Sequence, residues 1–79
     1  MSEFRAYDEV FDFIAAGPSS ANVADFRPSE STRQRVADLI AREKTSALSA
    51  EETSELEHYL QLEHLMRLAK ARARLLVGP

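Results

Sequence analysis

The stretch that decides the fold runs from residue 49 to residue 78 and reads SAEETSELEHYLQLEHLMRLAKARARLLVG. It opens with a capping box. In this motif the Ser49 hydroxyl accepts a hydrogen bond from the Glu52 backbone amide, and the Glu52 carboxylate accepts one from the Ser49 amide. No proline or glycine follows until Gly78, so nothing inside the stretch breaks an α-helix. The pattern predicts one long helix over about residues 50–77.

The charges of this predicted helix are ordered along its axis. Acidic residues gather in the first half and basic residues in about the last three turns, as the helix macrodipole favours. The acidic residues are Glu51, Glu52, Glu55 and Glu57, and the basic ones are Arg67, Lys70, Arg72 and Arg74. Because the dipole accounts for both groups, neither group alone indicates a ligand.

Three shorter helices are expected upstream, over about residues 3–16, 20–26 and 30–45. Gly17 followed by Pro18 ends the first, because glycine accepts the left-handed conformation and proline cannot continue a helix. Pro28 ends the second, since the residue before a proline is disfavoured in the α region. Ser29 caps the third.

These four helices place the chain in the all-α class, as a single helical domain over residues 1–79. The third and fourth are joined by a short connection at about residues 45–48, so we expect a helical hairpin with the first two helices as an N-terminal arm. A chain of 79 residues without cysteine has a thin core that no disulfide supplements. We therefore expect dimerisation or a partner protein to complete the fold.

The long helix carries more apolar surface than the preceding helices can cover. A surface helix needs an apolar stripe only ~100° wide, and the apolar residues of this one spread further around its axis. A homodimer, or a helix-in-groove contact with a different protein, would bury the remainder. The candidate partner-binding residues are Leu62, Leu65, Met66 and Leu68 as the apolar contact, with Arg67, Lys70 and Arg74 fixing orientation.

The chain lacks the residue patterns of an enzyme or a metal protein. It has no cysteine nucleophile, and its two glycines cannot build a phosphate-binding loop. Glu55 and His58 have the Glu-x-x-His spacing of a di-iron bundle, but a second motif would need an acid where Gln61 stands. His58 and His64 lie roughly 120° apart on a helical wheel. We expect no catalytic residue, no metal and no cofactor.

The net charge of the chain bears on whether it binds nucleic acid. Ten Lys and Arg against 13 Asp and Glu give a net charge of −3, whereas nucleic-acid binders usually carry a basic excess. One alternative is a small nucleic-acid-binding regulator, in which residues 21–40 form a helix-turn-helix that presents Arg33, Gln34 and Arg35. Another is a self-assembling protein with no other partner. No signal peptide or membrane span is indicated, so we expect a cytoplasmic protein.

Four segments occur in a recognisable order. FRPSE at residues 26–30 is followed by RVADLI at 35–40, LSAEE at 48–52 and LEHYLQLEHLMRLAKARAR at 56–74. This order resembles a group of small helical bacterial proteins, frequent in cyanobacteria, that are often encoded beside an HNH endonuclease or a toxin-like gene. The resemblance implies an antitoxin-like protein that binds a nuclease-like or toxin-like partner.

Overall fold

The computed structural model describes residues 5–78, which form four α-helices and no strand. In chain order these are α1 (Asp8–Ala15), α2 (Ser20–Asp25), α3 (Glu30–Glu43) and α4 (Ala50–Val77). The all-α prediction is confirmed.

The caps predicted from serines are present. The Ser49 and Glu52 side chains form the reciprocal capping box at the start of α4, and the Ser29 hydroxyl accepts from the Thr32 amide at the start of α3. Ser19 forms a further capping box with Asn22 at the start of α2. Local side-chain hydrogen bonds therefore set the first residues of α2, α3 and α4.

The predicted bounds differ from the observed ones by more than one residue at two helix ends. The third helix ends at Glu43, two residues before the predicted end. The first begins at Asp8, whereas residue 3 was predicted; residues 1–4 lie outside the described residues. Ahead of α1, the Arg5 amide donates to the Asp8 carboxylate and the Ala6 amide donates to Glu55 of α4. These bonds hold residues 5–7 in a turn outside the helical hydrogen-bond pattern.

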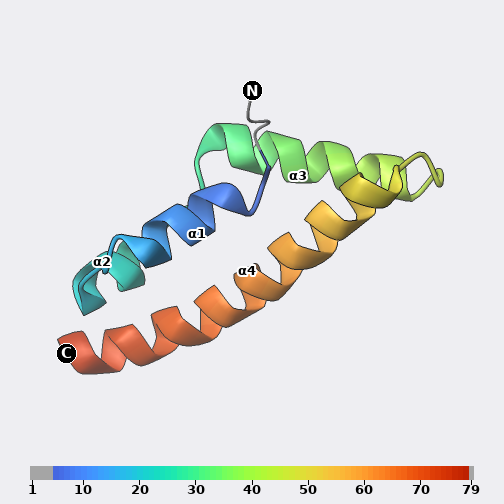
Figure 1. Cartoon of the computed structure of the whole chain (residues 1–79). Coiled ribbons are helices and arrows are strands. Elements are labelled where there is room, and N and C mark those ends of the chain that lie inside the picture. The colour runs from blue at the N-terminus through green and yellow to red at the C-terminus, as the bar shows by residue number, and fades with distance from the viewer. Residues whose placement is uncertain (1–4, 79) are drawn as a thin grey trace.

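The four helices form a wedge (Figure 1). The axes of α3 and α4 diverge from the loop that joins them, and α1 and α2 lie in the wide end of the V, on the same side of α4 as α3. The molecule measures 45 × 28 × 19 Å, with a radius of gyration of 14.1 Å. A compact chain of this length would have a radius of gyration of about 12 Å. The wedge is therefore elongated, and one side of α4 is left uncovered.

The main core lies where residues 6–10 meet the middle of α4. Ala6, Val10, Tyr59 and Met66 are buried there. Half-buried apolar residues surround this cluster, namely Tyr7, Phe13, Val23, Phe26, Val36 and Leu62. Nearer the loop, Leu39 of α3 and Leu56 of α4 are also buried. α4 thus contributes to the core along much of its length, but with one side only.

Candidate protein-binding surfaces

The structure divides the seven predicted partner-binding residues between two sides of α4. Met66 is only 6% exposed and belongs to the core, whereas its neighbour Leu65 is 53% exposed and Leu68 is 58% exposed. Leu62 is half-buried against the core. Because consecutive helical residues are ~100° apart around the axis, Met66 cannot share a contact surface with Leu65. We therefore describe the two sides of α4 separately.

An apolar cleft opens on the side that faces α1 and α2. We call it the inner cleft; it has a volume of about 170 Å³, and its lining residues are Val10, Phe26, Pro28, Tyr59, Glu63, Met66, Arg67 and Lys70. Two contacts hold Phe26 in place, one through its ring and one through its backbone. Its ring lies 4.4 Å from the Phe13 ring, and its carbonyl oxygen accepts a hydrogen bond of 2.8 Å from Lys70 Nζ.

The rim of the inner cleft is charged. Arg67 forms an exposed ion pair of 3.4 Å with Glu63, and exposed pairs of this kind are weak. Burial raises the pKa of the Tyr59 phenol in the floor, and the nearby Glu63 and Glu9 carboxylates raise it further. The phenol therefore stays protonated at neutral pH and can donate a hydrogen bond. The cleft combines an apolar floor with hydrogen-bond donors at its edge.

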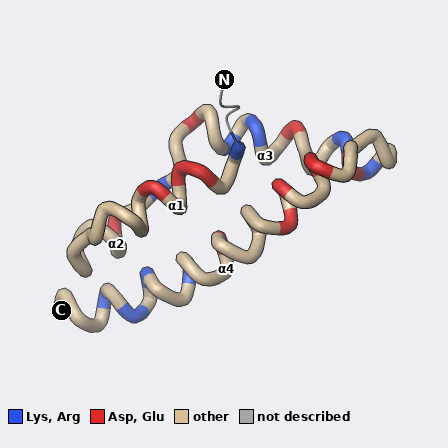
Figure 2. Tube along the Cα trace, in the orientation of Figure 1, with Lys and Arg blue, Asp and Glu red and all other residues tan. Residues whose placement is uncertain are grey.

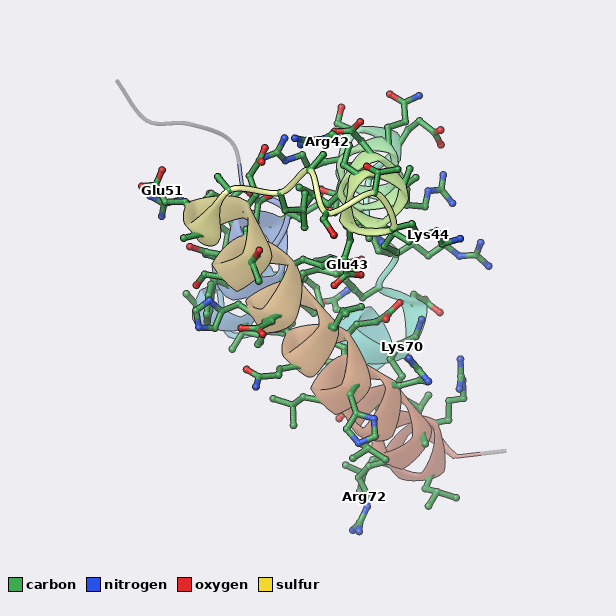
Figure 3. All side chains as sticks on the ribbon, turned by 90° about the vertical axis from the view of Figure 1, so that its right-hand side faces the viewer. Arg42, Glu43, Lys44, Glu51, Lys70 and Arg72 are labelled. Atoms are coloured by element: carbon green, nitrogen blue, oxygen red, sulfur yellow. The ribbon has the colours of Figure 1, made fainter. Side chains whose placement is uncertain are left out.

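The opposite side of α4 carries a row that we call the outer stripe. It consists of Gln61, Leu65, Leu68, Arg72 and Leu75, spaced alternately by four and three residues. All five are exposed, and Leu75 reaches 77% exposure. Figure 3 shows Arg72 projecting away from the other helices, while Lys70 is directed toward α2. The outer stripe and the inner cleft are therefore on different sides of one helix.

A third feature, a polar cavity of about 500 Å³, lies near the α3–α4 loop. Within it the Arg35 guanidinium forms two hydrogen bonds, of 3.0 and 2.8 Å, with the Glu55 carboxylate. The Ala6 amide donates to the same carboxylate at 2.8 Å. The Arg35 hydrogen bonds lower the pKa of Glu55, against the opposing effect of burial. Glu55 thus ties the N-terminal segment, α3 and α4 together.

Glu52 extends this charged network toward the loop. Arg42 donates to both of its carboxylate oxygens, at 3.0 and 2.7 Å, and the Ser49 amide donates at 3.1 Å. These bonds, with Arg42 contributing most, lower the pKa of Glu52 to about 2. Arg42 also forms an ion pair with Asp38, one turn earlier on α3, at 3.1 Å. Glu52, Glu55, Arg35 and Arg42 are paired with one another, and this geometry favours a structural role for them.

The sequence pattern groups Glu55 with the acidic residues that the helix dipole favours, yet its side chain is only 6% exposed. The spacing of residues along the helix does indicate this burial. Glu55 shares one face of the helix with Tyr59, Leu62 and Met66, at intervals of three and four residues. A carboxylate in line with core residues indicates a buried acid that needs a partner.

The alternative nucleic-acid contact gains no support from this geometry. Arg35 is held by Glu55, as described above. Arg33 pairs with Glu30 at 2.6 Å, and the Gln34 side chain donates to the same carboxylate at 3.4 Å. All three side chains therefore have partners within the chain.

Two further findings concern residues 5–78 as a whole. Within this range no group of three or more His, Cys, Asp or Glu side chains is placed to hold a metal ion. Of the two histidines, His58 packs edge-on against the Tyr7 ring at 5.6 Å. None of the helices in this range has both the length and the apolar character needed to cross a membrane.

Comparisons with known proteins returned no match: no family model fits the sequence, and no curated protein or solved structure is significantly similar to the chain. The surfaces of α4 are therefore the basis on which function is inferred.

Proposed function

We propose that the chain is a non-catalytic protein–protein interaction module that binds a partner protein at the inner cleft. The observation that carries this proposal is the half-open apolar cleft of about 170 Å³ beneath a charged rim. An apolar cavity of ~150 Å³ takes up a group the size of benzene. The inner cleft is therefore large enough for one aromatic or aliphatic side chain of a partner, the kind of anchor that dominates interface energies.

The charges around the cleft define the partner's chemistry further. Arg67 and Lys70 line the rim, Arg74 follows on the same side of α4 one turn later, and Glu63 is the single acid among the lining residues. Charge complementarity therefore favours a partner segment in which acidic side chains flank the apolar anchor. In this arrangement Met66 acts from the cleft floor, and Arg67, Lys70 and Arg74 fix orientation.

The sequence resemblance supports a nuclease-like or toxin-like protein as this partner, which the chain would restrain as an antitoxin does. This assignment rests on gene neighbourhood in similar proteins. We place the interaction in the cytoplasm, in keeping with a chain that has no cysteine. Self-assembly without any other partner is the competing proposal.

The test is capture of a stoichiometric partner from native lysate by the tagged protein, followed by identification of that partner by mass spectrometry. Arg67→Glu reverses a charge at the cleft rim and should abolish capture. Lys44→Glu makes the same change at the far end of α3, near the loop (Figure 3), and should leave capture intact. Equal capture by the two variants would exclude the cleft as the binding site.

The second stage tests the nature of the captured protein. Expressed alone it should arrest growth or degrade nucleic acid, and co-expression of the wild-type chain should restore growth. Arg67→Glu should fail to restore growth while remaining soluble and helical. A captured protein with neither activity would retain the interaction module but overturn the antitoxin-like role.

A further inference from the structure

The outer stripe has no contact within the chain that would cover its leucines. Leu65, Leu68 and Leu75 are all more than half exposed, and the flanking Leu76 is 70% exposed. The other three helices lie on the opposite side of α4 (Figure 1). We infer that this stripe is a homodimer interface, in which α4 of one protomer packs antiparallel against α4 of a second copy. The inference is independent of the inner cleft.

The spacing of the stripe fits this occupant. Positions that alternate by four and three residues form the seam of two-stranded helical packing. In an antiparallel pair centred between Leu65 and Leu68, Leu65 of one protomer meets the partner's Leu68, and Leu68 meets the partner's Leu65. The same register places Gln61 opposite the partner's Arg72, and the contact occurs twice by symmetry. A stripe that complements itself under a two-fold rotation is the pattern of an isologous dimer.

Charge selects the antiparallel orientation over the parallel one. A parallel pair would place Arg72 against Arg72 inside the seam, and like charges at close range are unfavourable. The antiparallel pair instead gives the Arg72 guanidinium the side-chain carbonyl of the partner's Gln61 as an acceptor.

The helix as a whole reinforces this choice. Figure 2 shows acidic residues along the first half of α4 and basic residues along the second half. In the register given above, the basic segment 67–74 of each helix lies beside residues 59–66 of the other, which contain Glu63 and no Lys or Arg. Antiparallel packing also opposes the two helix dipoles. A parallel pair would align like charges over the whole contact.

The proposed dimer interface is small, so the dimer is expected to be weak. The stripe covers the residues from Gln61 to Leu75, which is about 22 Å of helix. A contact of this length between two helices is at the small end of specific interfaces. The dimer should therefore dissociate on dilution, and its population should be followed over a range of protein concentrations.

Cross-linking tests the register directly, because the wild-type chain contains no cysteine. We would prepare Gln61→Cys and Arg72→Cys, each with a different mass tag, and oxidise them mildly, both alone and mixed. The antiparallel register places the two introduced thiols opposite one another across the interface. It keeps identical positions about 16 Å apart, beyond disulfide reach. We expect a mixed disulfide from the mixture and none from either variant alone.

The other outcomes overturn the inference. Disulfides formed by each variant with itself would show parallel packing. No disulfide in any sample, at concentrations where sedimentation detects a dimer, would place the dimer interface elsewhere on the molecule.

A matched pair of substitutions tests the stripe without oxidation. Leu68→Asp places a charge at the centre of the proposed interface. Leu60→Asp makes the same change at a leucine that is 44% exposed but lies about 80° away from Leu68 around α4. Sedimentation should show at least a tenfold weaker dimer for Leu68→Asp and no change for Leu60→Asp, with helicity retained in both. A monomeric wild-type chain at high concentration, or equal effects of the two substitutions, would exclude this interface.

Discussion

The two halves of α4 are held in different ways. Near the loop, directional charged contacts hold the helix, because Arg42 and Arg35 of α3 donate hydrogen bonds to the Glu52 and Glu55 carboxylates. Toward the C-terminal end, apolar contacts with α1 and α2 hold it, and its outward leucines remain exposed. Ion pairs with two hydrogen bonds fix geometry, whereas exposed apolar surface favours association. The comparison suggests that one half orients the helix and the other half binds.

The largest expected effect comes from removing Glu55, the acid that joins the N-terminal segment, α3 and α4. Glu55→Ala should lower the free energy of unfolding by about 3–4 kcal/mol, because it leaves Arg35 and the Ala6 amide without their buried acceptor. Urea unfolding followed by circular dichroism measures the change. Glu57→Ala, at an exposed position on the same helix, should change the value by less than about 0.5 kcal/mol. Similar losses for both would show that Glu55 stabilises only as a helix residue.

The next test separates the two sides of the binding half. Met66→Ala should cost about 2–3 kcal/mol, since it removes a buried side chain from the core. Leu65→Ala, one residue away, should cost less than about 0.5 kcal/mol when measured at low protein concentration, where dimers do not contribute. Thermal unfolding of the two variants gives the comparison. If Leu65→Ala proved the more damaging, the assignment of inner and outer sides would be reversed.

Acid should weaken the charged half selectively. The hydrogen bonds from Arg42 lower the pKa of Glu52 from 4.5 to about 2, and those from Arg35 lower the pKa of Glu55. The unfolded chain therefore takes up protons at a higher pH than the folded chain does. The stability from these groups is complete above about pH 5 and is lost as the pH falls toward about 2.

Urea midpoints at about pH 7, 4 and 2.5 measure this dependence. Glu52→Gln should show a shallower decline than the wild-type chain. A wild-type stability that stayed constant over this range would mean that neither carboxylate is stabilised by its arginine in solution.

The smallest expected effect lies in the loop beside the charged half. Ser46 has a φ of 59°, a left-handed conformation that favours glycine over residues with a Cβ atom. Ser46→Gly should therefore raise stability by about 0.5 kcal/mol, after the larger entropy of the unfolded glycine chain is subtracted. Thr45→Gly provides the control and should lower stability slightly. A loss at position 46 would show that the serine is not strained there.

The sequence was sufficient for features with local causes. The Ser49–Glu52 capping box and Gly78 predicted both ends of α4, because each signal acts within one helical turn. The pairing of Arg35 with Glu55 could not be predicted in the same way. Those residues are separated by 20 positions, and only the docking of α3 on α4 brings them together.

The candidate binding residues show the same limit. Leu65 and Met66 are both apolar, so composition cannot separate them, and the position of α1 and α2 decides which of the two is buried. Ile40 gives a second example. Its spacing from Val36 and Leu39 predicts one apolar stripe, but Ile40 is 37% exposed while Leu39 is fully buried. Periodicity identifies an apolar face, and tertiary packing determines how much of that face is covered.

The divergence of α3 and α4 from one loop has a mechanical consequence. With 28 residues, α4 is a lever about 42 Å long. A tilt of ~5° at the loop would displace its far end by ~4 Å, since displacement grows with distance from the pivot. Arg42 lies beside that pivot, bonded to Asp38 on α3 and to Glu52 on α4. Protonation of Glu52, or displacement of Arg42, would weaken these ion pairs. The resulting tilt of α4 would therefore change the width of the inner cleft.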